Sequence, residues 1–374
     1  MVTIVFTVDI GGHFLEYIHH LYDLCRGKNG EFVFLLPASF EKIKNQWQWE
    51  ESSNVLFELF DNTPFLYKTS NLGQFILSYK ISKLVQSYIK KYKAKALFSL
   101  NLTDFVPSAP LVISKETPIS GIVYKINIDN NHLPFKDRIY FSVLSKSPVF
   151  STIMILNDEK GAAKLNEIFG VNKFVSLPDP YIPLKFNKVN VRNDYLISEK
   201  KTLFVHFGAM NTNKATIDIL ESLYHLSIKE KEDYSFFFAG RVQEDIKDVF
   251  YKHYEALKYS VDIHIIDSYC SYDFFASLCL ACDAILIPYR RVYQSSGIIG
   301  YASQFNKPVI APNKGLLGQL VKEYKLGCLI EDNTPDSLIA AYKKISNGSI
   351  LAPTNAYCEK NSIEGFQKTI GEIF

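Results

Sequence analysis

The sequence contains no apolar run that approaches the roughly 20 residues needed for a membrane-spanning helix. Its N-terminus, "MVTIVFTVDIGG", has neither a basic start nor a long apolar stretch, so we expect no signal peptide. Six cysteines are scattered over 374 residues, which favours free thiols in a reducing compartment over a disulfide framework. These features predict a cytoplasmic protein.

Common nucleotide and metal signatures are also missing. The chain has no G-x-x-x-x-G-K-[ST] and no G-x-G-x-x-G, which disfavours a P-loop NTPase or a simple dehydrogenase. None of the histidines pairs at metal-ligand spacing, and the C-x-x-C of Cys279 and Cys282 lies in an apolar helical pattern without a second pair. A formal charge of +2 gives no reason to expect a nucleic-acid partner.

Apolar segments of strand length alternate with helical patterns along the whole chain. A hydrophobic share of 47% and a charged share of 21% are typical of globular proteins, and the length favours two domains. The alternation predicts an α/β fold with parallel sheets flanked by helices. The expected strands are 2–8, 31–37, 95–100, 120–126 and 151–156 in the first half, and 201–207, 234–240, 261–267, 283–289 and 307–312 in the second.

The segment 176–201 is the best candidate for a linker, because its three prolines and scattered charges break both periodicities. It predicts a first domain over 1–178 and a second over 179–358. The final helix, 359–374, is expected to pack back on the first domain. Ligands of open parallel sheets bind at the carboxyl ends of the strands, so we expect a site in a cleft between the two domains.

Four stretches of the second half follow one another in a distinctive order. They are "LFVHFGAMNTNKATIDILESL" (203–223), "SFFFAGRV" (235–242), "IHIIDSYCSYDFFASLCLACDAILIPYR" (263–290) and "SSGIIGYASQFNKPVIAPNKGLLGQLV" (295–321). In order and spacing they resemble the retaining, nucleotide-sugar-dependent glycosyltransferases of the GT-B fold, family 4 type, which have two facing Rossmann-like domains. In the first half, "FTVDIGGHFLEY" (6–17) is similar to the family's first glycine-rich loop, and "LPDPYIP" (177–183) to its interdomain linker.

The resemblance implies a donor site that holds a nucleoside diphosphate. Gly208 ends a strand, and the polar turn after it leads to a helix expected to begin near Lys214. Helix N-termini and a lysine ammonium both favour phosphate, and they would stabilise the charge of the leaving diphosphate, so Lys214 is also a catalytic candidate. Ser295, Ser296 and Gly297 begin a second such helix, although serine there is equally typical of a simple N-cap. No Asp-x-Asp occurs in the chain, so we expect neither a divalent metal nor a cofactor.

Other donor residues depart from the family pattern. Gly240 and Arg241 are expected near the nucleotide, but Ala209 stands where family members usually have an arginine. Arg241 or Arg290 would have to compensate for that missing charge. Two tyrosines replace the family's pair of glutamates, and the second of these tyrosines is expected near the ribose; the pair is Tyr293 and Tyr301.

The acceptor side is expected on the first domain. Gly11, Gly12 and His13 would line the cleft, with His13 as a catalytic candidate, although the segment is also typical of an ordinary β–α turn. Asn127 stands about where the family has its active-site histidine, and His132 is a weaker candidate nearby. Six lysines and no acid occur in 77–95, where apolar residues follow one helical face. That pattern is typical of an outer helix with a solvated basic side, and alternatively of contact with an anionic membrane surface.

These observations lead to one leading hypothesis and two alternatives. The leading hypothesis is a metal-independent, retaining glycosyltransferase that moves a hexose-type sugar from a nucleotide sugar to a glycan or lipid-linked acceptor. A nucleotide-sugar epimerase of the same architecture is the first alternative. The second is a non-catalytic binding or partner protein, which the substitutions at Ala209, Asn127, Tyr293 and Tyr301 favour.

Overall fold

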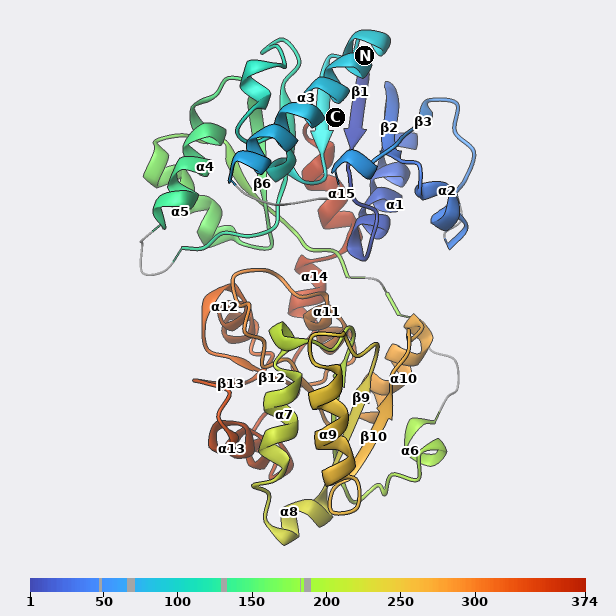
Figure 1. The fold of residues 1–374 in the computed structure, drawn as a ribbon, viewed down its shortest axis with the longest axis vertical. Coiled ribbons are helices and arrows are strands. Elements are labelled where there is room, and N and C mark those ends of the chain that lie inside the picture. The colour runs from blue at the N-terminus through green and yellow to red at the C-terminus, as the bar shows by residue number, and fades with distance from the viewer. Residues whose placement is uncertain (47–48, 66–70, 129–132, 182, 185–189) are drawn as a thin grey trace. The chain divides into compact units, whose positions relative to one another are not determined.

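In the computed structural model the chain is described over residues 1–46, 49–65, 71–128, 133–181, 183–184 and 190–374, and it divides into two compact units. Unit 1 comprises Met1–Asp179 and Ile363–Phe374, and unit 2 comprises Pro180–Ser362 (Figure 1). Each unit is built on one parallel sheet with helices on both faces. The fold is therefore the α/β architecture that the alternating sequence pattern predicts.

Within the described part of unit 1, seven parallel strands pair in the order β3-β2-β1-β4-β5-β6-β7. The strands are β1 (Val2–Phe6), β2 (Glu31–Pro37), β3 (Val55–Phe60), β4 (Ala96–Ser99), β5 (Ile119–Val123), β6 (Phe150–Leu156) and β7 (Phe174–Leu177). The helices and helical turns are α1 (His13–Arg26), α2 (Phe40–Ile43), η1 (Lys44–Gln46), η2 (Thr63–Phe65), α3 (Asn71–Tyr92), η3 (Leu102–Phe105), η4 (Ala109–Leu111), α4 (Phe135–Lys146), α5 (Glu159–Phe169) and α15 (Ile363–Gly371).

Within the described part of unit 2, six parallel strands pair in the order β10-β9-β8-β11-β12-β13. The strands are β8 (Thr202–Phe207), β9 (Tyr234–Ala239), β10 (Asp262–Ile266), β11 (Ala284–Leu286), β12 (Val309–Pro312) and β13 (Gly327–Ile330). The helices and turns are α6 (Val191–Asp194), η5 (Thr212–Lys214), α7 (Thr216–Leu223), α8 (Ile228–Asp233), α9 (Lys247–Leu257), α10 (Tyr272–Ala281), α11 (Gly297–Gln304), α12 (Gly315–Glu323), α13 (Pro335–Ser346) and α14 (Ala356–Lys360).

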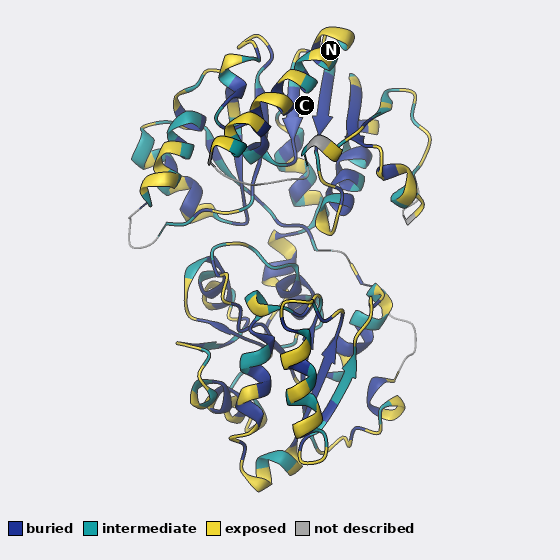
Figure 2. Ribbon diagram, viewed as in Figure 1, coloured by how far each residue is buried: buried dark blue, intermediate teal, exposed yellow. Residues whose placement is uncertain are grey.

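Each sheet separates two apolar cores, because successive side chains of a strand point to opposite faces. In unit 1, Phe6 packs with α3, α4 and α5, whereas Val5 belongs to the core beneath α1 and α15. In unit 2, Phe204 packs with α7, α9 and α13, whereas Val205 packs with α10, α11 and α12. Figure 2 shows the result, with buried strands at the centre of each unit and helices that are exposed on one side only.

The structure extends the predicted strand set at the edges of both sheets. β3 and β7 are the edge strands of unit 1 and β13 is an edge strand of unit 2, and none of these three was expected. All six cysteines are buried free thiols, as the sequence predicts. Among the residues described above, no helix combines the length and apolar character needed to cross a bilayer.

Candidate active site

The predicted donor residues of unit 2 lie on loops that follow three neighbouring strands. β9, β8 and β11 are adjacent in the sheet, and the segments after them contain residues 240–241, 208–214 and 287–297. Because the carboxyl ends of parallel strands share one edge of the sheet, these loops are neighbours despite their separation in sequence. This edge is where open α/β sheets bind their ligands.

Two glycines allow the first two loops to approach each other. Gly208 has φ +93° and Gly240 has φ +133°, which side chains of L-residues rarely tolerate. A Cβ atom on Gly240 would lie 2.2 Å from the carbonyl oxygen of Gly208. A Cβ atom on Gly208 would lie 2.6 Å from Nζ of Lys214, so the ammonium rests directly against the Gly208 backbone.

Lys214 places a cation at this edge of the sheet. Its Nζ donates to the carbonyl oxygen of Phe207 at 3.3 Å and lies 5.4 Å from the centre of the Tyr289 ring. Among the residues that the structure describes, no carboxylate forms an ion pair with it. Burial lowers the pKa of Lys214 from its ordinary value of 10.5 to about 8. A partly buried ammonium without a carboxylate partner is suited to an anionic ligand.

The turn before α7 has its own helical segment. The helix α7 begins at Thr216, close to Lys214 as expected, after η5 and after Ala215 in the left-handed conformation (φ 55°). The N–H of Lys214 donates to the side chain of Asn211 at 3.1 Å, and the N–H of Thr212 donates to Asp245 at 3.0 Å. These two main-chain donors are already used inside the protein. The ammonium, rather than the peptide groups expected there, is the donor that this turn offers.

His206 is a buried residue of β8 that sequence reasoning did not single out. Burial lowers its pKa to about 3, so the imidazole is neutral. Its Nδ1 lies 2.9 Å from the carbonyl oxygen of Leu286 and its Nε2 lies 3.0 Å from the hydroxyl of Thr216. The ring therefore donates to β11 and accepts from the first residue of α7, which fixes the start of that helix relative to the sheet.

Ser296 occupies the N-cap position of α11, but its side chain makes no capping hydrogen bond. It lies near the hydroxyl of Tyr289: burial raises the pKa of that phenol, and the neighbouring serine offsets a part of the rise. The same tyrosine ring lies beneath the Lys214 ammonium. The structure thus brings Gly208, Lys214 and Ser296 together around Tyr289, a residue that the sequence analysis missed.

The two candidate arginines differ in how they are paired. Both carboxylate oxygens of Asp218 accept from Arg290, at 2.6 and 2.8 Å. Its charge is therefore neutralised within the protein. Arg241 is exposed, and no ion pair of its guanidinium is found among the described residues. Of the two, Arg241 is the one available to compensate for the missing arginine at Ala209.

The two tyrosines that replace glutamates lie in different environments. Tyr293 is half-buried in the loop before α11. Tyr301 has only 7% of its surface exposed, and its ring lies 6.5 Å from that of Phe207 within the core. The ribose contact expected of Tyr301 stays a prediction, and its burial leaves little of the side chain open to a ligand.

The candidate acceptor residues lie at the carboxyl edge of the other sheet. Gly11 and Gly12 follow β1 and are exposed, and His13 begins α1 with its Nδ1 3.3 Å from a carboxylate oxygen of Glu16. Asn127 is half-buried beyond the end of β5. His132 lies outside the described residues.

A pair of tyrosines in unit 1, one buried and one half-buried, was not anticipated. The rings of Tyr17 and Tyr124 are nearly parallel, with centres 6.3 Å apart, and the Tyr17 hydroxyl donates to Asp179. Burial, and after it the Asp179 carboxylate, raises the pKa of both phenols. Because these partners come from distant parts of the chain, no local motif marks them.

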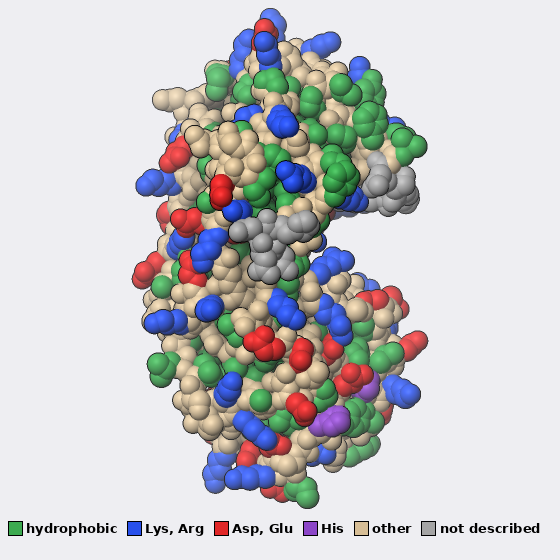
Figure 3. Space-filling view, turned by 90° about the vertical axis from the view of Figure 1, so that its left-hand side faces the viewer, with side chains coloured by type: hydrophobic (Ala, Val, Ile, Leu, Met, Phe, Trp, Pro, Cys, Tyr) green, Lys and Arg blue, Asp and Glu red, His purple; other side chains and the backbone are tan. Residues whose placement is uncertain are grey.

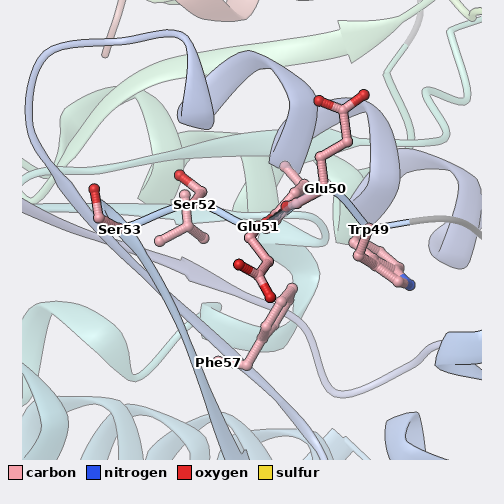
Figure 4. A pocket seen from close by; sticks show the side chains of 8 residues that line it. Trp49, Glu50, Glu51, Ser52, Ser53 and Phe57 are labelled. Carbon is pink, nitrogen blue, oxygen red and sulfur yellow. Dashed lines mark hydrogen bonds between the residues drawn. The ribbon is translucent and has the colours of Figure 1, made fainter.

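A hollow of about 560 Å³ in unit 1 is separate from these loops. It is formed by Tyr22 of α1 and by residues at the amino-terminal end of β3, including Trp49 and Glu51 (Figure 4). The figure shows the side chain of Glu51 beside Phe57, whereas the side chain of Glu50 points away from Phe57. Glu50 pairs with Arg26 at 2.6 Å. The amino-terminal end of a strand is opposite the edge where α/β sheets bind substrates, so we do not assign the chemistry to this hollow.

Comparison with known proteins agrees with this geometry. Residues 187–364 match the family described as Glycosyl transferases group 1, and the match covers the loops around Gly208, Lys214 and Ser296. The second half of the chain is therefore similar to the domain that this family model describes. The matched region includes most of unit 2 and therefore contains the partly buried Lys214.

The whole chain has the GT-B fold of two Rossmann-like domains, as solved structures with this fold show. HepE from Anabaena, solved with UDP and glucose, has 14% identity and a TM-score of 0.68 over 100% of this chain and 98% of its own. Sucrose-phosphate synthase from Thermosynechococcus elongatus has 10% identity and a TM-score of 0.72, with 100% and 97% covered. WaaG, a glycosyltransferase involved in lipopolysaccharide biosynthesis, has 16% identity and a TM-score of 0.65, with 100% and 99% covered. No curated protein sequence matches the chain.

Proposed function

We propose that the protein transfers a sugar from a nucleotide-diphosphate sugar to a glycan or lipid-linked acceptor, with retention and without a metal. Unit 2 would hold the donor and unit 1 the acceptor. The observation that carries this proposal is the Lys214 ammonium, which lies against Gly208 at a ligand-binding edge without a carboxylate partner among the described residues. The printed descriptions of HepE structures, which name UDP and UDP-glucose, support a nucleotide sugar as the donor.

The chemistry follows from where charge develops. As the bond between the sugar and the diphosphate breaks, negative charge grows on the leaving phosphate. Lys214 would offset that charge, and the N-terminus of α11 at Ser296 and Gly297 would add the favourable end of a helix dipole. The Ser296 hydroxyl would exchange or share its contact with Tyr289 to reach a phosphate oxygen. Gly240 and Arg241 would lie near the nucleotide.

The acceptor assignment extends this proposal to unit 1. Gly11, Gly12, His13 and Asn127 would surround the acceptor, with His13 as the candidate catalytic side chain of that loop. A cytoplasmic enzyme that makes a polysaccharide or a lipid-linked glycan, with peripheral membrane contact through 77–95, would fit these features.

The test is a panel of nucleotide sugars measured by thermal shift and then by hydrolysis. We expect one donor class to raise the melting temperature by several degrees at saturation, because a ligand at about 100 times its Kd stabilises the native state by about 2.7 kcal/mol. Lys214→Ala should weaken that binding about tenfold or more, since it removes a charge-assisted hydrogen bond. The donor assignment fails if no nucleotide or nucleotide sugar stabilises the protein.

A non-catalytic role is the second candidate, and the burial of Tyr301 favours it. A tyrosine side chain with 7% exposure leaves little surface for a hydrogen bond to a ribose, whereas an exposed glutamate carboxylate could accept one. Donor binding with no turnover across many acceptors would support this candidate. Product analysis by NMR would separately reveal an epimerase, because isomerisation of the donor would proceed without any acceptor.

A further inference from the structure

The hollow of about 560 Å³ beside β3 in unit 1 has aromatic side chains in its wall, namely Tyr22, Trp49 and Phe57. Its volume lies within the roughly 300–1,000 Å³ that is typical of sites for small ligands. The donor and acceptor candidates lie at the carboxyl edges of the two sheets, whereas this hollow lies at the amino-terminal end of a strand. It therefore belongs to neither group.

The aromatic side chains of the hollow are held in place by one another and by hydrogen bonds. The rings of Tyr22 and Phe57 are stacked with centres 5.5 Å apart, and Trp49 makes T-shaped contacts with both, at 5.2 and 5.6 Å. The indole N–H of Trp49 donates to the carbonyl oxygen of Lys44 at 2.6 Å. Trp49 and Phe57 are nevertheless only half-buried, so part of each side chain is open to a ligand. A surface that is already ordered loses little entropy when a ligand binds.

The loop before β3 adds polar groups to the hollow. Glu51, Ser52 and Ser53 line it. The Ser52 hydroxyl donates to Asn54, whose amide donates to three main-chain carbonyl oxygens, so the loop is fixed to the rest of unit 1. Within the described parts of the chain, Glu51 forms no ion pair and the Ser53 side chain no hydrogen bond. The Glu51 carboxylate lies beside the Phe57 ring (Figure 4).

The charges around the hollow distinguish it from another apolar surface of unit 1. Figure 3 shows hydrophobic side chains gathered on unit 1, with lysine and arginine side chains among them. None of the eight residues that line the hollow is a lysine or an arginine, and two are glutamates. The hollow would therefore repel a phosphate or another anion, whereas a neutral ligand is not repelled.

A pyranose ring matches both the apolar and the polar parts of the hollow. One side of a pyranose presents C–H groups, which pack against an aromatic side chain and are removed from water there. The rim of the same ring carries hydroxyl groups, which donate charge-assisted hydrogen bonds to a carboxylate. Phe57 and Trp49 provide the aromatic surface, and Glu51 provides the carboxylate.

We propose that this hollow is a second glycan-binding site, which holds a sugar unit of the acceptor or product chain away from its reacting end. The hollow lies at the amino-terminal end of β3, and the loop of Gly11 to His13 follows the carboxyl end of β1 in the same parallel sheet. A glycan that reaches both places must therefore contain several sugar units. Its two contacts would give a long acceptor a higher affinity than a short one. The choice of a glycan rests on the proposed function.

The test is tryptophan fluorescence of the intact protein, titrated with neutral oligosaccharides. The two tryptophans of the chain are residues 47 and 49, so the emission reports on this segment alone. The probes are the glucose series from maltose to maltohexaose and the corresponding galactose and mannose series. We expect at least one series to change the emission saturably, with a Kd on the order of 1 mM and tighter binding of the longer members.

Two substitutions test the two parts of the hollow. Glu51→Gln should weaken binding about tenfold, because it replaces charge-assisted hydrogen bonds by neutral ones. Phe57→Leu should weaken it about fivefold, from loss of the ring surface. Glu51 is exposed, so Glu51→Gln keeps the fold and decides alone if Phe57→Leu lowers the melting temperature. Glu50→Gln is the matched control and should bind like the parent, because Glu50 points away from Phe57 and pairs with Arg26 at 2.6 Å.

Three results would overturn the inference. The first is no saturable change with any series, and the second is equal weakening by Glu51→Gln and Glu50→Gln. The third is a saturable change with choline chloride and with no oligosaccharide, which would assign the aromatic surface to a cationic ligand. These titrations contain no nucleotide, and the thermal-shift panel of nucleotide sugars contains no oligosaccharide. Failure of the glycan site is therefore distinguishable from failure of the donor site.

Discussion

The position of Lys214 in unit 2 explains both its lowered pKa and its proposed role in binding a diphosphate. Its ammonium lies 2.6 Å from where a Cβ atom on Gly208 would be, and over the ring of the buried Tyr289. Burial makes the cation costly in the empty site, which is why its pKa falls to about 8. A bound diphosphate would reverse that shift, since it favours the protonated form.

Donor affinity should therefore depend on pH. Only the protonated lysine attracts the diphosphate, so affinity should be constant below about pH 8 and fall by up to about tenfold per unit above it. Lys214→Arg should bind with no such fall, because guanidinium stays charged, and Lys214→Gln should bind weakly at every pH. Calorimetric titration with the best-stabilising nucleotide sugar, from about pH 7 to about pH 9.5, measures this. The same pH profile in all three proteins would remove Lys214 from the site.

Gly208→Ala separates backbone strain from loss of the site. It forces alanine into φ +93° and puts its Cβ against the ammonium, so we expect a stability loss of about 1 kcal/mol and donor affinity at least about tenfold lower. Gly170→Ala is the matched control, because Gly170 also has positive φ (+62°) but no atom within 4 Å of an added Cβ. Urea unfolding and calorimetry should show similar destabilisation for both and lost affinity only for Gly208→Ala. Equal affinities would contradict the contact.

Gly208, Lys214 and Ser296 can be chosen as candidates from the sequence, because each belongs to a local pattern of strand, turn and helix; their role in a donor site stays a prediction. It did not reveal Tyr289 or His206. Their roles depend on partners that the sheet order brings together, such as Lys214 against Tyr289 and Thr216 against His206. Local patterns carry no information on those pairings.

Among the larger elements, interior strands were easier to predict than edge strands. β5 and β9 are buried along their whole length and appear as continuous apolar runs. β7 and β13 have only four residues each, and half of them are partly exposed. Such short, half-exposed segments give too weak a periodic signal to be separated from loops.

α15 should be a structural requirement of unit 1 although it comes at the end of the chain. Phe366 is fully buried beside Tyr17 in the core under α1. Phe366→Ala should cost about 3–5 kcal/mol of unfolding free energy, from lost burial and the cavity that remains. Gln367→Ala, which removes one hydrogen bond to the carbonyl of His20, should cost about 1 kcal/mol. Urea unfolding that gives equal losses for the two variants would contradict this packing.

In the molecule as a whole, each unit carries candidate residues at the carboxyl edge of its own sheet. Unit 2 has Gly208, Lys214 and Ser296 there, and unit 1 has the loop of Gly11 to His13. A transfer reaction needs one site for the donor and one for the acceptor, and we propose that unit 2 provides the first and unit 1 the second. The donor half rests on the stronger evidence, because it contains the family match and the lysine.

The most direct test of the donor site is a crystal structure of the intact protein soaked with a nucleoside diphosphate. We expect the two phosphates at the carboxyl edge of the unit 2 sheet, with an oxygen within about 3 Å of the Lys214 Nζ and another at the N-terminus of α11 beside Ser296. Diphosphate bound away from both groups, or no bound nucleotide at a saturating concentration, would contradict the account.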